Sequence, residues 1–507
     1  MSNAIEGLTP PLLWKYFAEI SKIPRESKRE AAISKYVVAT AKRLGLEVKA
    51  DKFGNVVVRK PGTAGREQAP SVALQGHLDM VCVKDEGKAH NFAKDPIVLV
   101  RKGNELMADG TTLGADNGIA VATNLAIMED KALEHGPLEL LFTVDEETGL
   151  TGANNLAPDF LRSRILINLD SEELGTLTVG CAGGRTTITR WALACDKAPA
   201  KSVAACVTVK GLRGGHSGIE IHKGRGNAIK ILARLLRALD DIGARIVSIK
   251  GGTKHNAIPN EAQAKVCIPA AAWEAAAACV DALAPVLKAE VAAVDPKLAI
   301  AIEPVKGGGK IKVLRTPLQK KLLAALSALP HGVVKMSAEI AGLVETSLNI
   351  AIIKNTAKAV ELVTSQRSSV ASEIDEICRT VEDILALAGA AVKTGGGYPG
   401  WKPNLDSPVL KVAKSTHAQL FGKEPEVMAV HAGLECGIIG EKYPGMDMVS
   451  MGPSIEGVHS PDEKIHIDSV PRYWNYLLAI LKNVSGGAGV SADMVQHGPD
   501  YPGWSPN

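Results

Sequence analysis

The chain has 507 residues, more than one ordinary domain contains, and 46% hydrophobic with 22% charged residues is typical of a globular protein with a substantial core. Its 58 Lys and Arg nearly balance 55 Asp and Glu, and no basic block stands out, so we expect neither nucleic acid nor a membrane surface as a partner. The N-terminus carries Glu6 and does not resemble a signal peptide, apolar stretches are interrupted by charges, and the eight cysteines form no CxxC pair, so we expect a cytoplasmic protein with reduced cysteines.

The first part of the chain, residues 1–185, predicts an α/β layer architecture. Helical periodicity covers 12–20 and 31–44. Short apolar or β-branched runs predict four strands, at 56–58, 71–74, 138–144 and 165–169. The last three runs are continuous enough to be buried on both faces of a sheet. Since ligands of open α/β sheets bind beyond the carboxyl ends of the strands, the polar residues that follow these runs are candidates for a site.

The second part, residues 186–400, predicts an α+β lid domain inserted into the first, because α/β texture returns in 401–486. Two segments of the lid, 256–283 and 347–387, share a strand pair followed by a helix, so an internally doubled lid is one alternative. Residues 487–507 are rich in Gly, Ser and Pro and are expected to form a flexible tail.

A short repeat links the lid with the tail. Residues 398–404 read YPGWKPN and residues 501–507 read YPGWSPN, a match at six of seven positions. A tail segment without function is the simpler interpretation of the second copy.

Two candidate metal ligands lie in the first part, one after a predicted strand and one in a turn before a predicted helix. In LQGHLDM, the His77 imidazole can bind a metal while Asp79 orients it, although a lone histidine at this place is more often structural. In LGADNGIAVA, Asp116 lies in a glycine-flanked turn before a helical run, where a helix cap is an equally good interpretation.

Further acidic residues gather at strand ends. In LFTVDEETG, three adjacent acids, Asp145, Glu146 and Glu147, repel one another with no Lys or Arg nearby, so a cation is the economical explanation and a solvated turn the alternative. The segment ILINLDSEE places Asp170 in the same way, and GVHSPDE adds His459. Two histidines and three carboxylates form an oxygen and nitrogen set suited to two zinc ions.

The motifs together resemble a known family. The order HLD, GADNG, DEETG, NLDSEE and GVHSPDE, with GGHSG between the last two, is similar to the dinuclear-zinc aminoacylase and carnosinase clan over nearly the whole chain. The forms LGADNGIA, DEETGLTGA, GCAGGR and HAGLECG resemble its aminoacyl-histidine dipeptidases. The resemblance implies a zinc-exopeptidase-like catalytic domain with a mixed central sheet.

The resemblance also implies a role for each metal-site residue. One zinc would be held by His77, Asp116 and Asp170, and the other by Asp116, Glu147 and His459, so that Asp116 bridges the two ions. Glu146 would be the general base and Asp79 would orient His77.

For the lid, the resemblance implies residues that contact substrate. His216 of GGHSG would stabilise the oxyanion, with a turn histidine as the alternative. Arg367 and Asn256 would bind the substrate carboxylate, and Arg367 is the better candidate because a guanidinium binds a carboxylate in a two-pronged fork. His431 and Glu435 of HAGLECG would line or support the site.

The implied activity is metal-dependent hydrolysis of unblocked dipeptides, including Xaa-His, by a metal-bridging hydroxide that Glu146 generates. The implied cofactors are two divalent ions per chain, zinc or alternatively cobalt or manganese. An N-acyl amino acid amidohydrolase on the same metal centre is an alternative. A catalytically silent peptide-binding protein is another, against which the intact Glu146 argues. A homodimer is an alternative to a monomer, because a single lid would need a partner subunit to supply His216 and Arg367.

Overall fold

The computed structural model describes residues 3–305 and 311–486, and the chain divides into two compact units. Unit 1 comprises Met1–Gly180, Pro403–Ala429 and Leu434–Asn507, and unit 2 comprises Cys181–Lys402 and Val430–Gly433. The chain therefore leaves unit 1 at residue 180 rather than 185, and it crosses briefly back into unit 2 at a place that the sequence did not predict. The predicted tail, 487–507, lies outside the described residues.

Unit 1 is an α/β unit around an eight-stranded sheet with the strand order β1-β2-β6-β3-β7-β23-β8-β22. Its strands are β1 Glu47–Ala50, β2 Val56–Lys60, β3 Val72–His77, β6 Leu138–Thr143, β7 Ile165–Asn168, β8 Thr176–Cys181, β22 Glu426–Val430 and β23 Asp447–Ser450. A small second sheet contains β4 Leu99–Lys102, β5 Glu105–Ala108, β24 Ile455–Glu456 and β25 Lys464–His466. The helices are η1 Asn3–Ile5, α1 Pro11–Ile20, α2 Ala31–Arg43, α3 Ala115–Glu129, α4 Glu146–Gly149, α5 Thr151–Asn154, α10 Pro408–Phe421, α11 Glu435–Lys442 and α12 Ser469–Ser485.

The central sheet of unit 1 is mixed. Strand β3 pairs in parallel with both β6 and β7, and β7 pairs in parallel with β23, whereas β2 pairs antiparallel with β6. All residues of β3, β6 and β7 are buried, as expected for strands covered on both faces. The predicted strands and the predicted helices at 12–20 and 31–44 are therefore confirmed, with ends shifted by up to three residues.

Unit 2 is an α+β unit built on a nine-stranded antiparallel sheet. The sheet contains β9 Gly183–Ala192, β11 Ser202–Lys210, β13 Arg245–Gly251, β15 Ala262–Pro269, β16 Ala299–Pro304, β18 Gly332–Met336, β19 Val344–Asn355, β20 Ala359–Ser368 and β21 Ala391–Tyr398. Two short pairs add β10 Cys195–Lys197 with β17 Lys312–Leu314, and β12 Gly215–His216 with β14 Ala257–Ile258. The helices are η2 Ile221–Lys223, α6 Ala228–Asp241, η3 Ala270–Ala272, α7 Trp273–Val291, α8 Thr316–Ala328 and α9 Ala371–Leu387.

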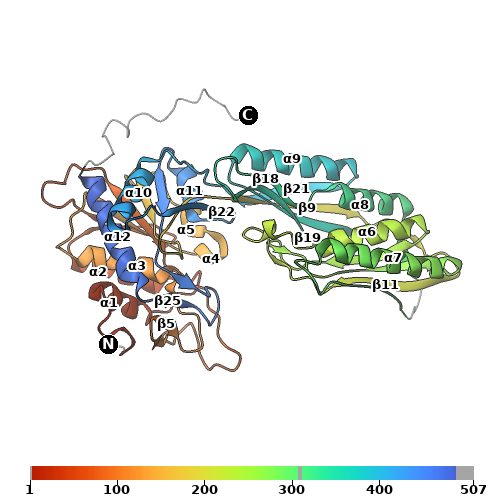
Figure 1. Ribbon diagram of the computed structural model, residues 1–507, viewed down its shortest axis with the longest axis horizontal. Coiled ribbons are helices and arrows are strands. Elements are labelled where there is room, and N and C mark those ends of the chain that lie inside the picture. Colours follow the sequence, from red (N-terminus) through yellow and green to blue (C-terminus); the bar gives the residue numbers. More distant parts are fainter. Residues whose placement is uncertain (1–2, 306–310, 487–507) are drawn as a thin grey trace. The chain divides into compact units, whose positions relative to one another are not determined.

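Helices α6 to α9 and the large sheet of unit 2 share one hydrophobic core. Helix α9 packs on β9, β20 and β21, and α9, β9 and β21 are labelled in Figure 1. The mixed sheet of unit 1 and the inserted unit 2 together confirm the expected fold class. The doubling of the lid stays a prediction, since β19 pairs with β20 in the second segment whereas β14 pairs with β12 in the first.

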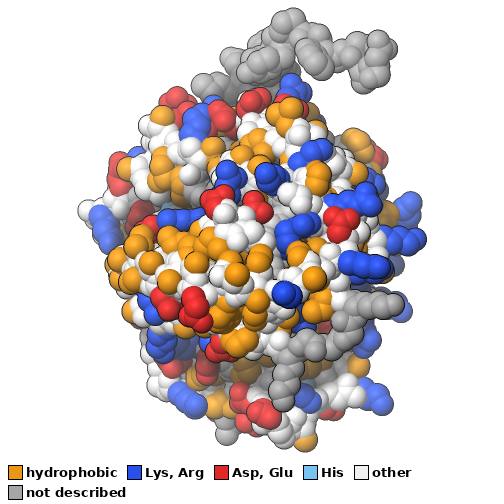
Figure 2. All heavy atoms as spheres, turned by 90° about the vertical axis from the view of Figure 1, so that its right-hand side faces the viewer, with side chains coloured by type: hydrophobic (Ala, Val, Ile, Leu, Met, Phe, Trp, Pro, Cys, Tyr) orange, Lys and Arg blue, Asp and Glu red, His pale blue; other side chains and the backbone are white. Residues whose placement is uncertain are grey.

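One helix of unit 2 corrects the expectation that charges interrupt every apolar stretch. Residues 270–291 have a mean hydropathy of 1.4 over an 18-residue window and are long enough to cross a membrane by length and composition. Three side chains of α7, Ala276, Val280 and Leu287, are buried in the core of unit 2. On the face of the molecule shown in Figure 2, hydrophobic, basic and acidic side chains are interspersed.

Candidate metal centre

Three parallel strands of unit 1 end at the same edge of the sheet and deliver the candidate residues there. Strand β3 ends at His77, β6 ends just before the acids at 145–147, and β7 ends two residues before Asp170. Because β3 pairs in parallel with both neighbours, these polar residues meet at one edge.

The first group of candidate ligands combines His77, Asp116 and Asp170. Nε2 of His77 lies 3.0 Å from Oδ1 of Asp116 and 3.5 Å from Oδ1 of Asp170. One ligand atom of each residue lies within 4.8 Å of the others. His77 is almost fully buried, which fixes where its imidazole can point.

The second group combines Asp116, Glu147 and His459. Nε2 of His459 lies 3.2 Å from Oδ2 of Asp116 and 3.0 Å from Oε2 of Glu147. Asp116 therefore belongs to both groups, with one carboxylate oxygen facing each histidine. Its backbone is not helical (φ −78°, ψ 111°) although it lies in the first turn of α3, and this departure aims the side chain between the two histidines.

Asp79 is more than a support for His77. Its buried carboxylate lies 3.3 Å from Nδ1 of His77 and accepts hydrogen bonds from the backbone N–H groups of Glu146 at 3.1 Å and of Glu147 at 3.2 Å. Burial opposes ionisation, but the close imidazole of His77 together with these amides lowers the pKa of Asp79 to about 2. One carboxylate thus orients residues from two strand ends.

The three adjacent acids at the end of β6 do not act alike. Glu146 and Glu147 each join a candidate ligand group with His77. Asp145 is buried, and its carboxylate accepts from the hydroxyls of Thr148 and Thr151 in the turn that follows. The argument from three mutually repelling acids therefore holds for only two of them at this centre.

The charge balance at this edge fits bound cations. Burial raises the pKa of Glu146 well above its usual value, and neighbouring Asp170 and Glu147 add to the shift. Burial, with Asp116 and Glu147, raises the pKa of Asp170 to about 6 against the lowering influence of His77. Within the described part of the chain, the ion pairs of Asp116, Glu147 and Asp170 are made with histidines alone. Two divalent ions would relieve this repulsion, and the oxygen and nitrogen donors suit zinc.

Glu435 lies behind the metal-site edge of unit 1 and is fully buried. Its Oε2 accepts from Nε2 of Gln75 and from the hydroxyl of Thr143, both at 2.6 Å, whereas its Oε1 has no hydrogen-bond partner among the described residues. Burial raises its pKa to about 7. This geometry supports the ends of β3 and β6.

In unit 2, local hydrogen bonds fix the tautomer of His216. Its Nδ1 accepts from the backbone N–H groups of Gly218 at 3.2 Å and Ile219 at 3.3 Å, so the ring hydrogen must be on Nε2. The backbone N–H of His216 donates to Oε2 of Glu220 at 2.8 Å. Burial first, and then the charge of Arg367, lower the pKa of His216 to about 4, so the imidazole is neutral at pH 7.

Arg367 is buried in unit 2 and partly satisfied. Its Nη1 donates to the hydroxyl of Tyr398 at 2.8 Å, and its Nε has no hydrogen-bond partner among the described residues. Burial, and then the charge of Arg367, lower the pKa of His431 to about 3, and Nε2 of His431 lies 2.7 Å from the hydroxyl of Ser347. Ser347 is the cross-strand partner of Arg367, which brings these groups together.

Asn256 lies beside His216. The carbonyl of Asn256 accepts from the N–H of Ser217 at 2.9 Å, and His216 pairs with Ala257 across the two short strands. The four candidates in unit 2, His216, Asn256, Arg367 and His431, therefore come from four separate chain segments that belong to this unit.

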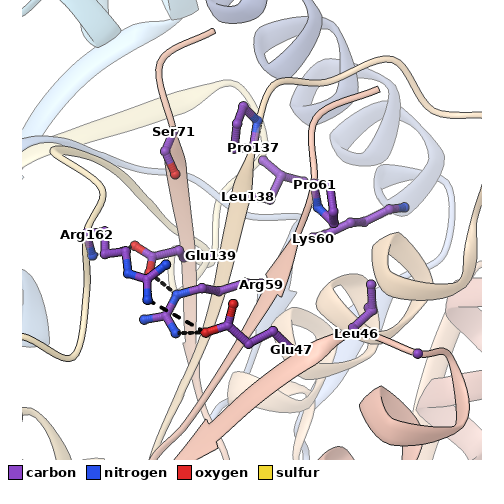
Figure 3. A pocket seen from close by; sticks show the side chains of 11 residues that line it. Leu46, Glu47, Arg59, Lys60, Pro61, Ser71, Pro137, Leu138, Glu139 and Arg162 are labelled. Carbon is purple, nitrogen blue, oxygen red and sulfur yellow. Dashed lines mark hydrogen bonds and ion pairs between the residues drawn. The ribbon is translucent and has the colours of Figure 1, made fainter. Parts of the chain in front are cut away.

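A separate pocket of about 450 Å³ lies in unit 1, at the end of β3 and β6 that is opposite to the candidate metal ligands (Figure 3). Its lining includes the first residues of β6 and Ser71, the residue before β3. Arg59 pairs there with Glu47 at 2.6 Å and with Glu139 at 2.9 Å. Its acidic and basic side chains thus neutralise one another, unlike the acids at the metal-site edge.

Comparison with known proteins decides the family. Residues 73–483 match the model of peptidase family M20/M25/M40, a span that contains every candidate site residue. The chain belongs to this family. The resemblance predicted from the motifs is confirmed, and with it the expectation of a metallopeptidase.

Relatives within the peptidase family cover almost the whole chain. A cytosol non-specific dipeptidase of Escherichia coli is 42% identical over 95% of this chain and 99% of its own length. The crystal structure of an aminoacylhistidine dipeptidase from Vibrio alginolyticus is 41% identical, has a TM-score of 0.87, and matches 94% of this chain and 97% of that one. A tripeptidase from Staphylococcus aureus, 20% identical with a TM-score of 0.55 over 94% of this chain and 99% of that one, shares the fold.

Sequence reasoning missed several residues that shape this peptidase site. Tyr398, which bonds Arg367, lies in the YPGW segment whose repeat drew attention for another reason. Arg25 and Glu463 bond backbone groups next to the candidate metal ligands His77 and Asp116. Glu463 closes the GVHSPDE motif, so its place beside His459 was visible, but its burial was not.

Proposed function

We propose that this chain hydrolyses the peptide bond of unblocked dipeptides, including Xaa-His, in the cytoplasm. The observation that carries the proposal is Asp116, whose two oxygens face His77 and His459, because this is the arrangement of a carboxylate that bridges two ions. The near full-length similarity to dipeptidases of E. coli and V. alginolyticus supports the substrate class.

The residues that would hold two zinc ions are the two groups that share Asp116. When bound, such ions polarise a carbonyl oxygen and make water more acidic. His77 is held for this task by Asp79, which lies 3.3 Å from its Nδ1 and leaves Nε2 free to point at a ligand.

Glu146 is the proposed general base. Its backbone is fixed by Asp79 at the first turn of α4, and its carboxylate shares a candidate group with His77 and Glu147. Burial raises its pKa, so the carboxylate can take a proton from the attacking water and afterwards release it to the leaving amine.

His216 is proposed to donate a hydrogen bond to the developing oxyanion. Its Nδ1 is occupied by two backbone amides, so Nε2 carries the hydrogen and can act only as a donor. Its lowered pKa means that this donor is a neutral imidazole near pH 7.

Arg367 is proposed to bind the C-terminal carboxylate of the dipeptide. The hydroxyl of Tyr398 holds Nη1, while the buried Nε remains without a partner among the described residues. A buried donor without a partner costs free energy, which a substrate carboxylate would recover. Asn256 and His431 are proposed as additional substrate contacts, and a homodimer is a further prediction that sedimentation can test.

The test is hydrolysis of Ala-His, Gly-Gly and N-acetylated amino acids, with the metal content measured on the same preparation. We expect cleavage of both dipeptides, two metal ions per chain, loss of activity with a chelator and recovery with zinc. Cleavage of only the N-acetylated substrates would favour the amidohydrolase instead. An active protein with less than about one ion per chain that ignores chelators would refute the two-metal centre.

A further inference from the structure

Two buried charged residues of unit 1 form hydrogen bonds with the backbone around the candidate metal centre. Glu463 is 2% exposed, and Arg25 is 3% exposed. Burying a charge is costly unless it is compensated by hydrogen bonds or by an opposite charge. The partners of these two side chains therefore indicate what they do.

The Glu463 carboxylate accepts hydrogen bonds from the backbone of the segment that leads into Asp116. Its Oε2 accepts from the N–H groups of Leu113 at 2.8 Å and Gly114 at 2.9 Å. Its Oε1 accepts from those of Ala115 at 2.7 Å and Asp116 at 3.2 Å. Four consecutive amides are thus satisfied by one carboxylate that lies 347 residues further along the chain.

The Arg25 guanidinium donates a hydrogen bond to a backbone carbonyl of the same segment. Its Nη2 donates to the carbonyl of Gly114, while its Nη1 donates to the carbonyls of Leu78 at 3.1 Å and Asp79 at 2.8 Å. Arg25 therefore ties the Asp116 segment to the strand end that carries His77. A Cβ at Gly114 would lie 2.5 Å from Nη2 of Arg25, so this close approach needs glycine.

These contacts connect the three parts of the metal centre. Arg25 links the segments of His77 and Asp116, and Glu463 links Asp116 to the loop that carries His459 four residues earlier. The two oxygens of Asp116 face these same two histidines. The segment is held by its amides on one side and by a carbonyl on the other, so its position is fixed relative to both histidines.

We propose that Arg25 and Glu463 are positioning residues that hold Asp116 between the two metal sites, so that both ions are bound tightly. The inference rests on the proposed two-metal centre. A residue that places a bridging ligand acts on both sites at once, whereas a residue beside one ligand acts on one site.

The test is the affinity of the whole chain for Zn²⁺ and Co²⁺, measured by competition with a chelator. Glu463→Gln keeps the size of the side chain, but its amide nitrogen faces backbone donors and cannot accept from them. We expect the affinity for both ions to fall about 10- to 100-fold, as for other residues that orient metal ligands. The Co²⁺ absorption spectrum of the loaded protein should change as well, because the ligand geometry is altered.

The matched control is Asp462→Asn, which removes the same charge from the adjacent, exposed residue of the loop. It should bind both ions like the unchanged protein. Arg25→Lys keeps the charge, but the lysine cannot reach two segments at once. This variant should also bind both ions more weakly. In the double variant, the loss should be smaller than the product of the single losses, since both residues hold the same segment.

The outcomes are separable. If the unchanged protein and Asp462→Asn bind fewer than two ions, the proposed function fails. If they bind two ions and Glu463→Gln binds them with unchanged affinity, the positioning role is wrong. The role is also wrong if Glu463→Gln and Arg25→Lys are both unfolded when metal-free, because the two residues would then support the fold as a whole. Weaker binding of only one of the two ions would mean that Glu463 supports a single site, and this result would likewise contradict the proposal.

Discussion

At the scale of single residues, the candidate site depends on carboxylates with different environments. Asp79 is ionised because an imidazole and two amides surround it, whereas burial and like charges raise the pKa of Glu146. Side chains of the same chemical class can thus orient ligands in one place and carry protons in another.

Replacing Glu146 by Gln should remove most of the turnover. The amide fills the same space but cannot accept a proton, so kcat should fall by about 10² to 10⁴-fold while the metal content stays near two ions per chain. Steady-state kinetics together with metal analysis would measure both quantities. Glu173→Gln, an exposed residue after the next strand, is the control and should retain full activity. Near-normal kcat in the Glu146 variant would exclude this residue as the base.

Replacing Arg367 by Ala should affect substrates according to their carboxylate. For dipeptides, kcat/KM should fall by about 10- to 150-fold, which corresponds to a charge-assisted hydrogen bond of about 1.5 to 3 kcal/mol. Dipeptide amides, which lack the carboxylate, should lose much less. Arg379→Ala removes an exposed arginine of α9 and should change neither substrate. Equal losses for dipeptides and their amides would show that another residue binds the carboxylate.

At the scale of elements, the crossing of α3 over β3 sets the place of Asp116. Asn117, the next residue, accepts from the N–H of His77 at 3.1 Å and donates to the carbonyl of Leu169 at 3.0 Å. Gly76 allows this close packing, because a Cβ there would lie 2.4 Å from Oδ1 of Asn117 and 2.5 Å from Cβ of Ala120.

Gly76→Ala should therefore push α3 away from β3. Overpacking of this kind destabilises a protein by about 1 to 3 kcal/mol, and here it should also weaken metal binding because α3 carries Asp116. Denaturant unfolding and chelator competition would measure the two effects. Gly395→Ala, at a position where a Cβ meets no atom within 4 Å, is the control and should change neither. A variant with unchanged stability and metal affinity would contradict the tight packing of these elements.

At the scale of the whole molecule, unit 2 contains several histidines that folding keeps neutral. Burial, with the nearby Lys230, lowers the pKa of His331 from 6.5 to about 4, and burial also lowers those of His216 and His431. Between these values the unfolded chain binds more protons than the folded chain, so the free energy of unfolding decreases as the pH falls from about 6.5 to about 4.

His331→Gln should reduce this pH dependence. One such histidine contributes up to about 1.4 kcal/mol per pH unit between its two pKa values. Urea unfolding at several pH values between 4 and 7 would show a shallower slope for the variant than for the unchanged protein. Lys288→Gln, which changes an exposed side chain of α7 and no histidine, should leave the slope unchanged. Equal slopes for all three proteins would show that His331 titrates alike in both states.

The sequence by itself determined the α/β class, the inserted second unit and the residues at the strand ends. It could do so because buried strands are continuous apolar runs, and because His77, the acids at 146–147 and Asp170 follow such runs directly. The family motifs are equally local, since each lies within one turn or strand end. Their order along the chain was therefore sufficient to indicate the family.

Only the tertiary structure decided which distant residues meet and which charges are buried. Glu463 accepts from amides almost 350 residues away, Glu435 bonds the ends of two strands, and Arg25 links two turns. Two of these residues lie in recognisable motifs, but the motifs do not show which partners the side chains meet. It also separated Asp145 from its two acidic neighbours and placed Tyr398 on Arg367. These facts depend on packing between remote segments, which fixes distances and removes water, and neither quantity is encoded in a short stretch of residues.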